Sequence, residues 1–71
     1  MLTQRQEKIL TLIIDEYIQT SLPVCSEFLA KRLGKISPAT IRNEMTILTK
    51  EGFLLQPHTS SGRAPSEAAY R

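Results

Sequence analysis

Residues 38–50 carry polar side chains of the types that read the edges of DNA base pairs. At about 100° per residue, Ile41, Met45 and Leu48 form one apolar stripe, and polar positions fall on the opposite side. Arginine can bond guanine or a phosphate, asparagine can pair with adenine through both amide atoms, and threonine can contact a phosphate or a thymine methyl group. The candidate contacts are Ala39, whose small side chain lets the backbone approach the bases, and Thr40, Arg42, Asn43 and Thr46.

The start of this segment suits a phosphate as well. Ser37 is a good N-cap and Pro38 gives up an amide that would have no partner in the first helical turn. The free amides and the positive end of the helix dipole near Ser37 favour an anion there. The alternative is that these polar residues form an ordinary solvated face, as on any amphipathic helix. The short turn before the helix, its serine–proline start and the hairpin expected after it favour the DNA interpretation.

Three further cations are candidate DNA contacts. Arg63 follows Gly62 in a turn-rich stretch, where we expect it to reach a phosphate or the minor groove; the alternative is an ordinary exposed turn residue. Arg32 and Lys35 lie around the turn before residue 38 and are expected to neutralise phosphates. Residues 1–30 carry a net charge of −2 and residues 31–71 one of +4, which points modestly to a polyanionic partner for the second half.

Other chemistry finds little support. Cys25 is the only cysteine and His58 the only histidine, so a metal site within one chain would lack ligands and no internal disulfide can form. No serine has a histidine placed by a known motif to activate it. We therefore expect no enzyme activity, cofactor or metal, and we interpret Cys25 as a small apolar filler at the entrance to the second helix. A sensor that uses Cys25 or His58 remains a weaker alternative.

Size and composition limit the architecture. A chain of 71 residues and 8.0 kDa has room for one small domain. The longest apolar run is three residues, Leu12 to Ile14, whereas a membrane span needs roughly 20. The N-terminus lacks the layout of a secretion signal, so a cytoplasmic domain without membrane contact is expected.

Three helices are expected to position the candidate contacts. Thr3 and Gln6 form a capping box that opens a first helix reaching about Gln19, before Pro23. Its predicted apolar face is Leu10, Ile13, Ile14 and Tyr17, flanked by Ile9 and Ile18; Ile9 and Leu12, off this stripe, could dock a partner subunit. A second helix is predicted over Ser26–Leu33 and stopped by Gly34, and the third runs from Pro38 to Gly52. Two helices joined by the short turn 34–37 indicate a helix-turn-helix.

The remaining segment predicts a small β-hairpin. Residues 53–56 have strand-like composition, residues 57–62 are rich in turn formers, and residues 63–65 could return as a second strand. The predicted fold class is mainly α with a small β wing: a winged helix-turn-helix with three helices followed by a short hairpin. Residues 1–71 would form one DNA-binding domain, with 66–71 starting a connecting helix.

Two runs of residues resemble one known family closely. Residues 37–45 (SPATIRNEM) and 56–63 (QPHTSSGR), with Leu22–Ser26 and Glu51–Leu54, resemble the HrcA family of bacterial heat-inducible transcription repressors. The resemblance covers essentially the whole chain. Departures are Cys25 where the family usually has glycine, Ser61 and Ala64 where alanine and isoleucine are common, and Ala69 where glycine is usual.

The resemblance implies a winged-helix domain that represses heat-shock and chaperone operons. It further implies a homodimer on an inverted-repeat operator in double-stranded DNA, with the GroEL chaperonin keeping the full-length repressor competent. Ser37, Ala39, Thr40, Arg42 and Asn43 would read the operator half-site, and Arg63 would serve the wing. Family members are much longer, so we expect a DNA-binding domain from a longer chain. The alternative function is a winged-helix protein-interaction module without specific DNA binding.

Overall fold

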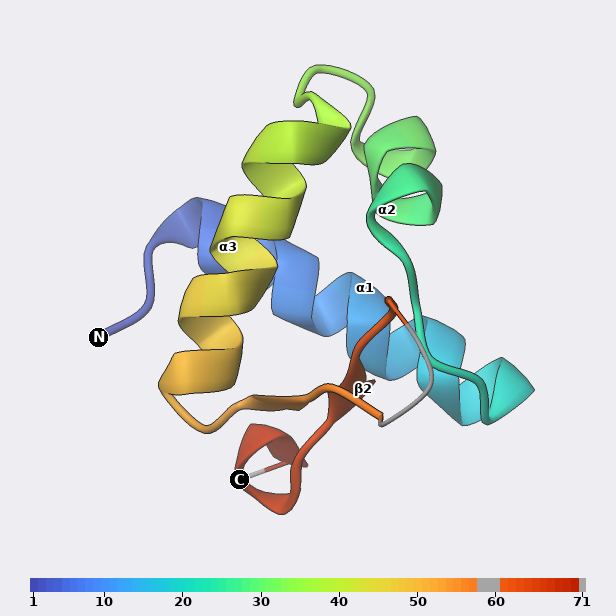
Figure 1. The fold of residues 1–71 in the computed structure, drawn as a ribbon, viewed down its shortest axis with the longest axis vertical. Coiled ribbons are helices and arrows are strands. Elements are labelled where there is room, and N and C mark those ends of the chain that lie inside the picture. Colours follow the sequence, from blue (N-terminus) through green and yellow to red (C-terminus); the bar gives the residue numbers. More distant parts are fainter. Residues whose placement is uncertain (58–60, 71) are drawn as a thin grey trace.

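The computed structural model describes residues 1–57 and 61–70. Three helices precede a two-stranded antiparallel sheet and a short 3₁₀ helix (Figure 1). The elements are α1 (Gln4–Thr20), α2 (Ser26–Leu33), α3 (Pro38–Lys50), β1 (Leu54–Leu55), β2 (Ala64–Pro65) and η1 (Glu67–Tyr70). This order confirms the predicted winged helix-turn-helix. Among the described residues, no helix is both long enough and apolar enough to cross a membrane.

Local signals set both ends of α1. Thr3 accepts a hydrogen bond from the Gln6 amide, and the Gln6 side chain accepts one from the Thr3 amide, so the predicted capping box is confirmed. The helix ends at Ser21, which adopts a left-handed backbone conformation with φ of 59° and donates its amide hydrogen to the carbonyl of Tyr17.

The buried face of α1 is rotated from the predicted one. Ile9, Leu10 and Ile13 are buried, whereas Tyr17 is only half-buried and Ile18 is exposed. The prediction that Ile9 lies off the core stripe, free to dock a partner, is therefore wrong. The apolar positions of α1 span a broad arc, and packing against α3 and the sheet selects the part of that arc that includes Ile9.

The helix-turn-helix forms where the sequence predicts it. Gly34 ends α2 with φ of 77°, a conformation that favours glycine. Ser37 caps α3 by accepting a hydrogen bond from the Thr40 amide, and Pro38 occupies the first helical position. Gly52, with φ of 88°, follows the C-cap of α3. Cys25, expected as a filler, is half-buried at the N-cap of α2.

The hairpin, residues 54–65, is called the wing below. Leu54 pairs with Pro65 and Leu55 with Ala64, so both strands are shorter than predicted. Arg63 pairs instead with Val24, in the segment between α1 and α2, through hydrogen bonds of 2.8 and 2.9 Å in the two directions. Residues 58–60, including the predicted turn and His58, lie outside the described residues. The wing is thus attached to the helices along its returning strand.

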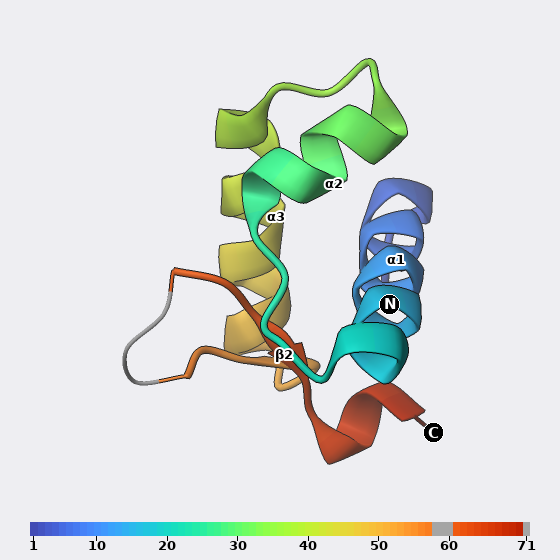
Figure 2. The same cartoon turned by 90° about the vertical axis from the view of Figure 1, so that its right-hand side faces the viewer.

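The core lies where the three helices and β1 meet. Ile9 and Ile13 of α1, Leu29 of α2 and the predicted stripe of α3 are fully buried together with Leu54. Residues 67–70, where a further helix was predicted to begin, form η1, and Ala69 packs against this core. Figure 2 shows α3 and the strands leading into the wing on one side of the domain, with α1 on the other.

Candidate nucleic-acid interface

The polar face of α3 is open to solvent. Ile41, Met45 and Leu48 are buried, and on the opposite side Ile47 is exposed together with five other residues: Ala39, Arg42, Asn43, Thr46 and Lys50. We call these five the outer face of α3. The 13 residues of α3 make a rod about 20 Å long and about 10–12 Å across, which matches the width of about 12 Å of the DNA major groove. The predicted exposure of this face is confirmed.

Three hydroxyl groups at the start of α3 and along it are bonded within the helix itself. The Ser37 hydroxyl accepts from the Thr40 amide at 3.2 Å and lies 3.1 Å from the Thr40 hydroxyl, which is half-buried. The Thr46 hydroxyl donates to the carbonyl of Arg42 at 3.0 Å. These bonds fix the orientation of each hydroxyl, and the Thr46 oxygen keeps lone pairs that can accept from a DNA base.

Arg42 is oriented by the start of α2. One guanidinium nitrogen lies 3.8 Å from a carboxylate oxygen of Glu27 and 3.5 Å from the Ser26 hydroxyl. Both charged side chains are more than half exposed, so the ion pair is weak and solvent-screened. The pKa of Glu27 is lowered, first by a hydrogen bond from a backbone amide at the helix start, and further by the Ser26 hydroxyl and the charge of Arg42. Glu27 is therefore ionised at neutral pH, and it holds Arg42 along one edge of the outer face.

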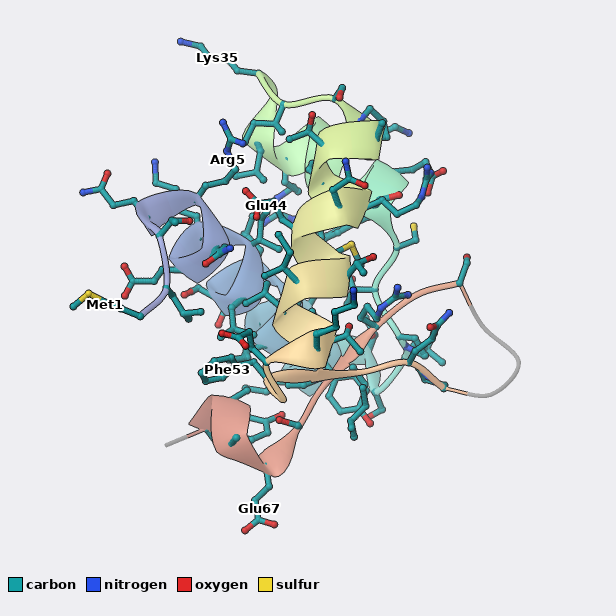
Figure 3. All side chains as sticks on the ribbon, turned by 60° about the vertical axis from the view of Figure 1, so that its left-hand side comes forward. Met1, Arg5, Lys35, Glu44, Phe53 and Glu67 are labelled. Atoms are coloured by element: carbon teal, nitrogen blue, oxygen red, sulfur yellow. The ribbon has the colours of Figure 1, made fainter. Side chains whose placement is uncertain are left out.

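The two cations predicted near the turn lie in different places. Lys35 is exposed and extends from the turn away from the body of the domain (Figure 3). Arg32 is exposed too, but its guanidinium stacks over the Phe28 ring at 5.3 Å from the centroid. It lines a shallow groove of about 260 Å³ between α1 and α2, which also includes Leu12. Lys35 therefore lies in the turn just before α3, whereas Arg32 lies on the side of α2 that faces α1.

Arg63 is not the exposed wing residue that was expected. It is only 8% exposed, although it follows a polar, turn-rich stretch. Its Nε donates to the Thr49 hydroxyl at 3.1 Å, and one Nη donates to the carbonyl of Ser61 at 2.8 Å. The expectation of exposure is wrong because contacts with the end of α3 bury the side chain. That Arg63 contacts DNA stays a prediction.

A polar contact between α1 and α3 was missed by the sequence analysis. Gln6 is buried, and its Nε2 donates to a Glu44 oxygen at 3.1 Å; Arg5 lies 3.5 Å from the other Glu44 oxygen. Figure 3 shows Arg5 and Glu44 between the two helices. Helical periodicity places Glu44 beside the apolar stripe, which is the one sequence signal for this contact; its partner in α1, 38 residues away, has none.

Within residues 1–57 and 61–70, no three side chains of histidine, cysteine, aspartate or glutamate gather as metal ligands would. The candidate site is the outer face of α3: Arg42, at one edge, pairs with Glu27, and Glu44, at the opposite edge of the helix, is bonded to α1.

Comparisons with known proteins agree with this geometry. The family described as "Winged helix-turn-helix transcription repressor, HrcA DNA-binding" matches residues 1–71. Relatives named heat-inducible transcription repressor HrcA include those of Mycoplasma capricolum, 56% identical over 72 residues, and Carboxydothermus hydrogenoformans, 55% identical over 73 residues. Another, from Chloroflexus aggregans, is 48% identical over 71 residues.

A solved crystal structure, described only as that of a hypothetical protein, has the same fold. It superposes with a TM-score of 0.91 at 41% identity over 97% of this chain and 22% of that chain. The matches to the Mycoplasma and Carboxydothermus relatives cover 100% of this chain but only 21% of each relative. The match to the Chloroflexus relative covers 99% of this chain and 19% of the relative. The chain therefore spans about a fifth of the length of these relatives. Because the match covers every residue and the fold is that of a winged helix, the chain belongs to the HrcA family of transcription repressors, as its DNA-binding domain.

Proposed function

We propose that this domain inserts α3 into the major groove of an operator in double-stranded DNA and thereby helps to repress heat-shock and chaperone genes. The observation that carries the proposal is the outer face of α3, which is solvent-exposed and combines Arg42 with Asn43. Both side chains can make two hydrogen bonds to one base, guanine for arginine and adenine for asparagine.

The neighbouring positions support the same docking. Ala39, one turn before Asn43, leaves room for the backbone to approach the bases. Thr46 presents a hydroxyl of fixed orientation, and Ser37 and Thr40 lie at the helix start, where the dipole favours a phosphate. Lys35, and Arg32 from its place on α2, would neutralise phosphates beside the groove. The wing would follow the backbone or the minor groove on the side of α3.

The full-length protein would bind as a homodimer. Two copies of α3 would then enter successive turns of an inverted repeat, which raises affinity through effective concentration. We propose the homodimer and the dependence on the GroEL chaperonin for the full-length protein, with residues 1–71 as one domain and 66–71 leading into a connecting helix. A bacterial operator as target implies action in the cytoplasm.

The alternative function, a protein-interaction module, fits the outer face less well. A helix that docks on a protein usually presents an apolar stripe, whereas Ile47 is the one large apolar side chain exposed on α3, and the outer face presents mainly amide, guanidinium, hydroxyl and ammonium groups. The family match also favours DNA.

The test begins with a pool of random-sequence duplexes, from which the 71-residue chain enriches its preferred sequence. Fluorescence anisotropy then compares that duplex with a base-shuffled one across a salt series. We expect tighter binding to the enriched duplex, with affinity falling steeply as salt rises. Equal affinity for both duplexes at every salt concentration would mean attachment to any polyanion and would contradict the proposal.

Two variants separate base reading from phosphate neutralisation. Asn43→Ala should lose roughly 1–3 kcal/mol on the enriched duplex, and much less on the shuffled one, because a base contact carries sequence information. Lys35→Ala should weaken both duplexes alike and lower the salt slope by about 1. If Asn43→Ala leaves the preference unchanged, Asn43 is not the reading residue.

A further inference from the structure

The buried guanidinium of Arg63 connects the wing to the end of α3. Its Nε donates to the Thr49 hydroxyl at 3.1 Å, and one Nη donates to the carbonyls of Ser61 at 2.8 Å and Gly62 at 3.3 Å. One planar side chain therefore bonds the wing to Thr49 of α3, a residue 14 positions away in the sequence. Burying a charged side chain costs free energy unless its hydrogen-bond donors find acceptors. The bonds to Thr49, Ser61 and Gly62 therefore explain why the guanidinium can be buried here.

The Thr49 hydroxyl has a fixed direction. It donates its one hydrogen to the carbonyl of Met45 at 2.7 Å, which leaves its lone pairs for the Arg63 Nε. Thr49 stands two helical turns after Arg42 and so lies on the same edge of the outer face. The wing is thus bonded to α3 beside the surface proposed to enter the groove.

The backbone around Arg63 is held just as closely. Arg63 pairs in both directions with Val24, and a Cβ added at Gly62 would lie 3.0 Å from the Pro23 Cβ and 3.1 Å from the Val24 carbonyl oxygen. The returning strand therefore passes against the segment that leads into α2, at a separation that only glycine permits without displacement.

We propose that Arg63 is a positioning residue: its guanidinium fixes the wing relative to α3 and does not itself bind DNA. This inference rests on the proposed function, because it assigns how the wing is held for that docking. It replaces the phosphate or minor-groove contact expected from the sequence. It also explains the requirement for arginine, since the Nε and the Nη of one rigid fork reach Thr49 and Ser61 together, whereas a lysine ammonium is a single point.

The salt dependence of DNA binding distinguishes a phosphate-binding Arg63 from a positioning Arg63. Residues 54–65 contain no other arginine or lysine. If Arg63 neutralised a phosphate, replacing it with glutamine would lower the salt slope by about 0.9, and lysine would largely restore binding. If Arg63 positions the wing, glutamine and lysine should weaken binding to the same extent, about threefold to tenfold as the wing loses its fixed place, and leave the salt slope unchanged.

Thr49 supplies the matched neutral test. Thr49→Val removes the acceptor with no change in charge and little in shape, and should weaken DNA binding about threefold to tenfold. Thr49→Ser keeps the hydroxyl and should bind like the original chain. In the Arg63→Lys background, Thr49→Val should cause little further loss of DNA binding, because both substitutions remove the same Arg63–Thr49 hydrogen bond. Thr11→Val, on the exposed side of α1, is the control for a threonine-to-valine change and should leave binding unaltered.

A measurement without DNA tests the contact directly. In nitrogen-15 NMR spectra of the free chain, the Arg63 Nε–H should exchange slowly with solvent, and Thr49→Val should accelerate that exchange and shift the amide signals of Ser61 and Gly62. Thr49→Ser should not. Circular dichroism of each variant ensures that binding is measured on folded protein.

The outcomes are distinct. Fast Nε–H exchange in the original chain, or rescue of binding by Arg63→Lys with a lowered slope for Arg63→Gln, would overturn the positioning role. Equal binding of the original chain to enriched and shuffled duplexes would contradict the proposed function, while the NMR result would still decide how the wing is held.

Discussion

The ion pair between Glu27 and Arg42 leads to a prediction of a gain in binding. Arg42 must reach a base or a phosphate, yet in the free domain it lies 3.8 Å from the Glu27 carboxylate. DNA must compete with that carboxylate and also approach its negative charge. Glu27→Gln removes the charge and keeps the size and hydrogen-bonding capacity of the side chain, so we expect the variant to bind DNA more tightly.

The expected gain is modest because both partners are exposed. A surface ion pair is weak in solvent, so releasing Arg42 should raise affinity by at most about fivefold. Removing the repulsion between the carboxylate and a nearby phosphate adds a factor of only about 1.4, because physiological salt screens most of that repulsion. Together these effects predict an increase in affinity of about 1.4- to 7-fold for every duplex.

Fluorescence anisotropy at two salt concentrations measures this gain. Glu7→Gln is the matched control, because Glu7 is also an exposed acid in the first turn of a helix but belongs to α1. We expect the gain from Glu27→Gln to exceed that of the control and to shrink at high salt. Affinity that falls, or that changes no more than in Glu7→Gln, would refute the idea that Glu27 restrains Arg42.

The pH dependence follows from the lowered pKa of Glu27. Because the pKa is depressed in the fold, the stabilisation from the ionised carboxylate is complete above its unfolded pKa and is lost as the pH falls through the folded value. Glu27 therefore stays charged from pH 6 to pH 8, and the affinity ratio of Glu27→Gln to the original chain should be constant over that range. A ratio that drifts toward one between pH 8 and pH 6 would contradict the depressed pKa.

Three further substitutions test the scaffold beneath the outer face by urea denaturation. Met45→Ala empties a fully buried position and should lower the free energy of unfolding by about 2–5 kcal/mol; a loss below about 1 kcal/mol would contradict its place in the core. Gly62→Ala should destabilise by about 1–3 kcal/mol, since the new Cβ would lie 3.0 Å from the Pro23 Cβ, and an unchanged midpoint would argue against that close approach. Glu44→Ala leaves the buried Gln6 amide without this acceptor and should lose about 1–3 kcal/mol, whereas Glu44→Gln, which keeps an oxygen, should lose less.

The elements that could be predicted from the sequence are those fixed by neighbouring residues. The Thr3–Gln6 capping box, the Ser37–Pro38 start and the left-handed Gly34 each satisfy backbone groups within a few positions, so residue type and spacing were sufficient. The exposure of Asn43 and its neighbours followed in the same way from the periodicity of α3.

Features fixed by distant residues were predicted less well. The rotation of α1 that buries Ile9 depends on what packs against it, and the pairing of Arg63 with Val24 joins positions far apart in the chain. The burial of Arg63 is the clearest case. Its local sequence is typical of an exposed turn, and the hydroxyl of Thr49, the distant partner among its acceptors, is not apparent from that local sequence.

Two contacts that the sequence analysis missed, those of Glu44 and Thr49, fix the orientation of the outer face of α3, whose exposure the sequence did predict. Glu44 and Thr49 flank the buried stripe of α3 on opposite edges, and each is bonded to a different part of the domain, Gln6 of α1 and Arg63 of the wing. A helix held at both edges of its buried side cannot roll about its own axis without breaking one of these bonds. Arg42 and Asn43 therefore present a fixed direction before DNA arrives, and binding loses less conformational entropy than it would with a helix free to rotate. On this reasoning, Glu44→Ala should weaken discrimination between enriched and shuffled duplexes even in molecules that remain folded, although Glu44 lies outside the exposed face.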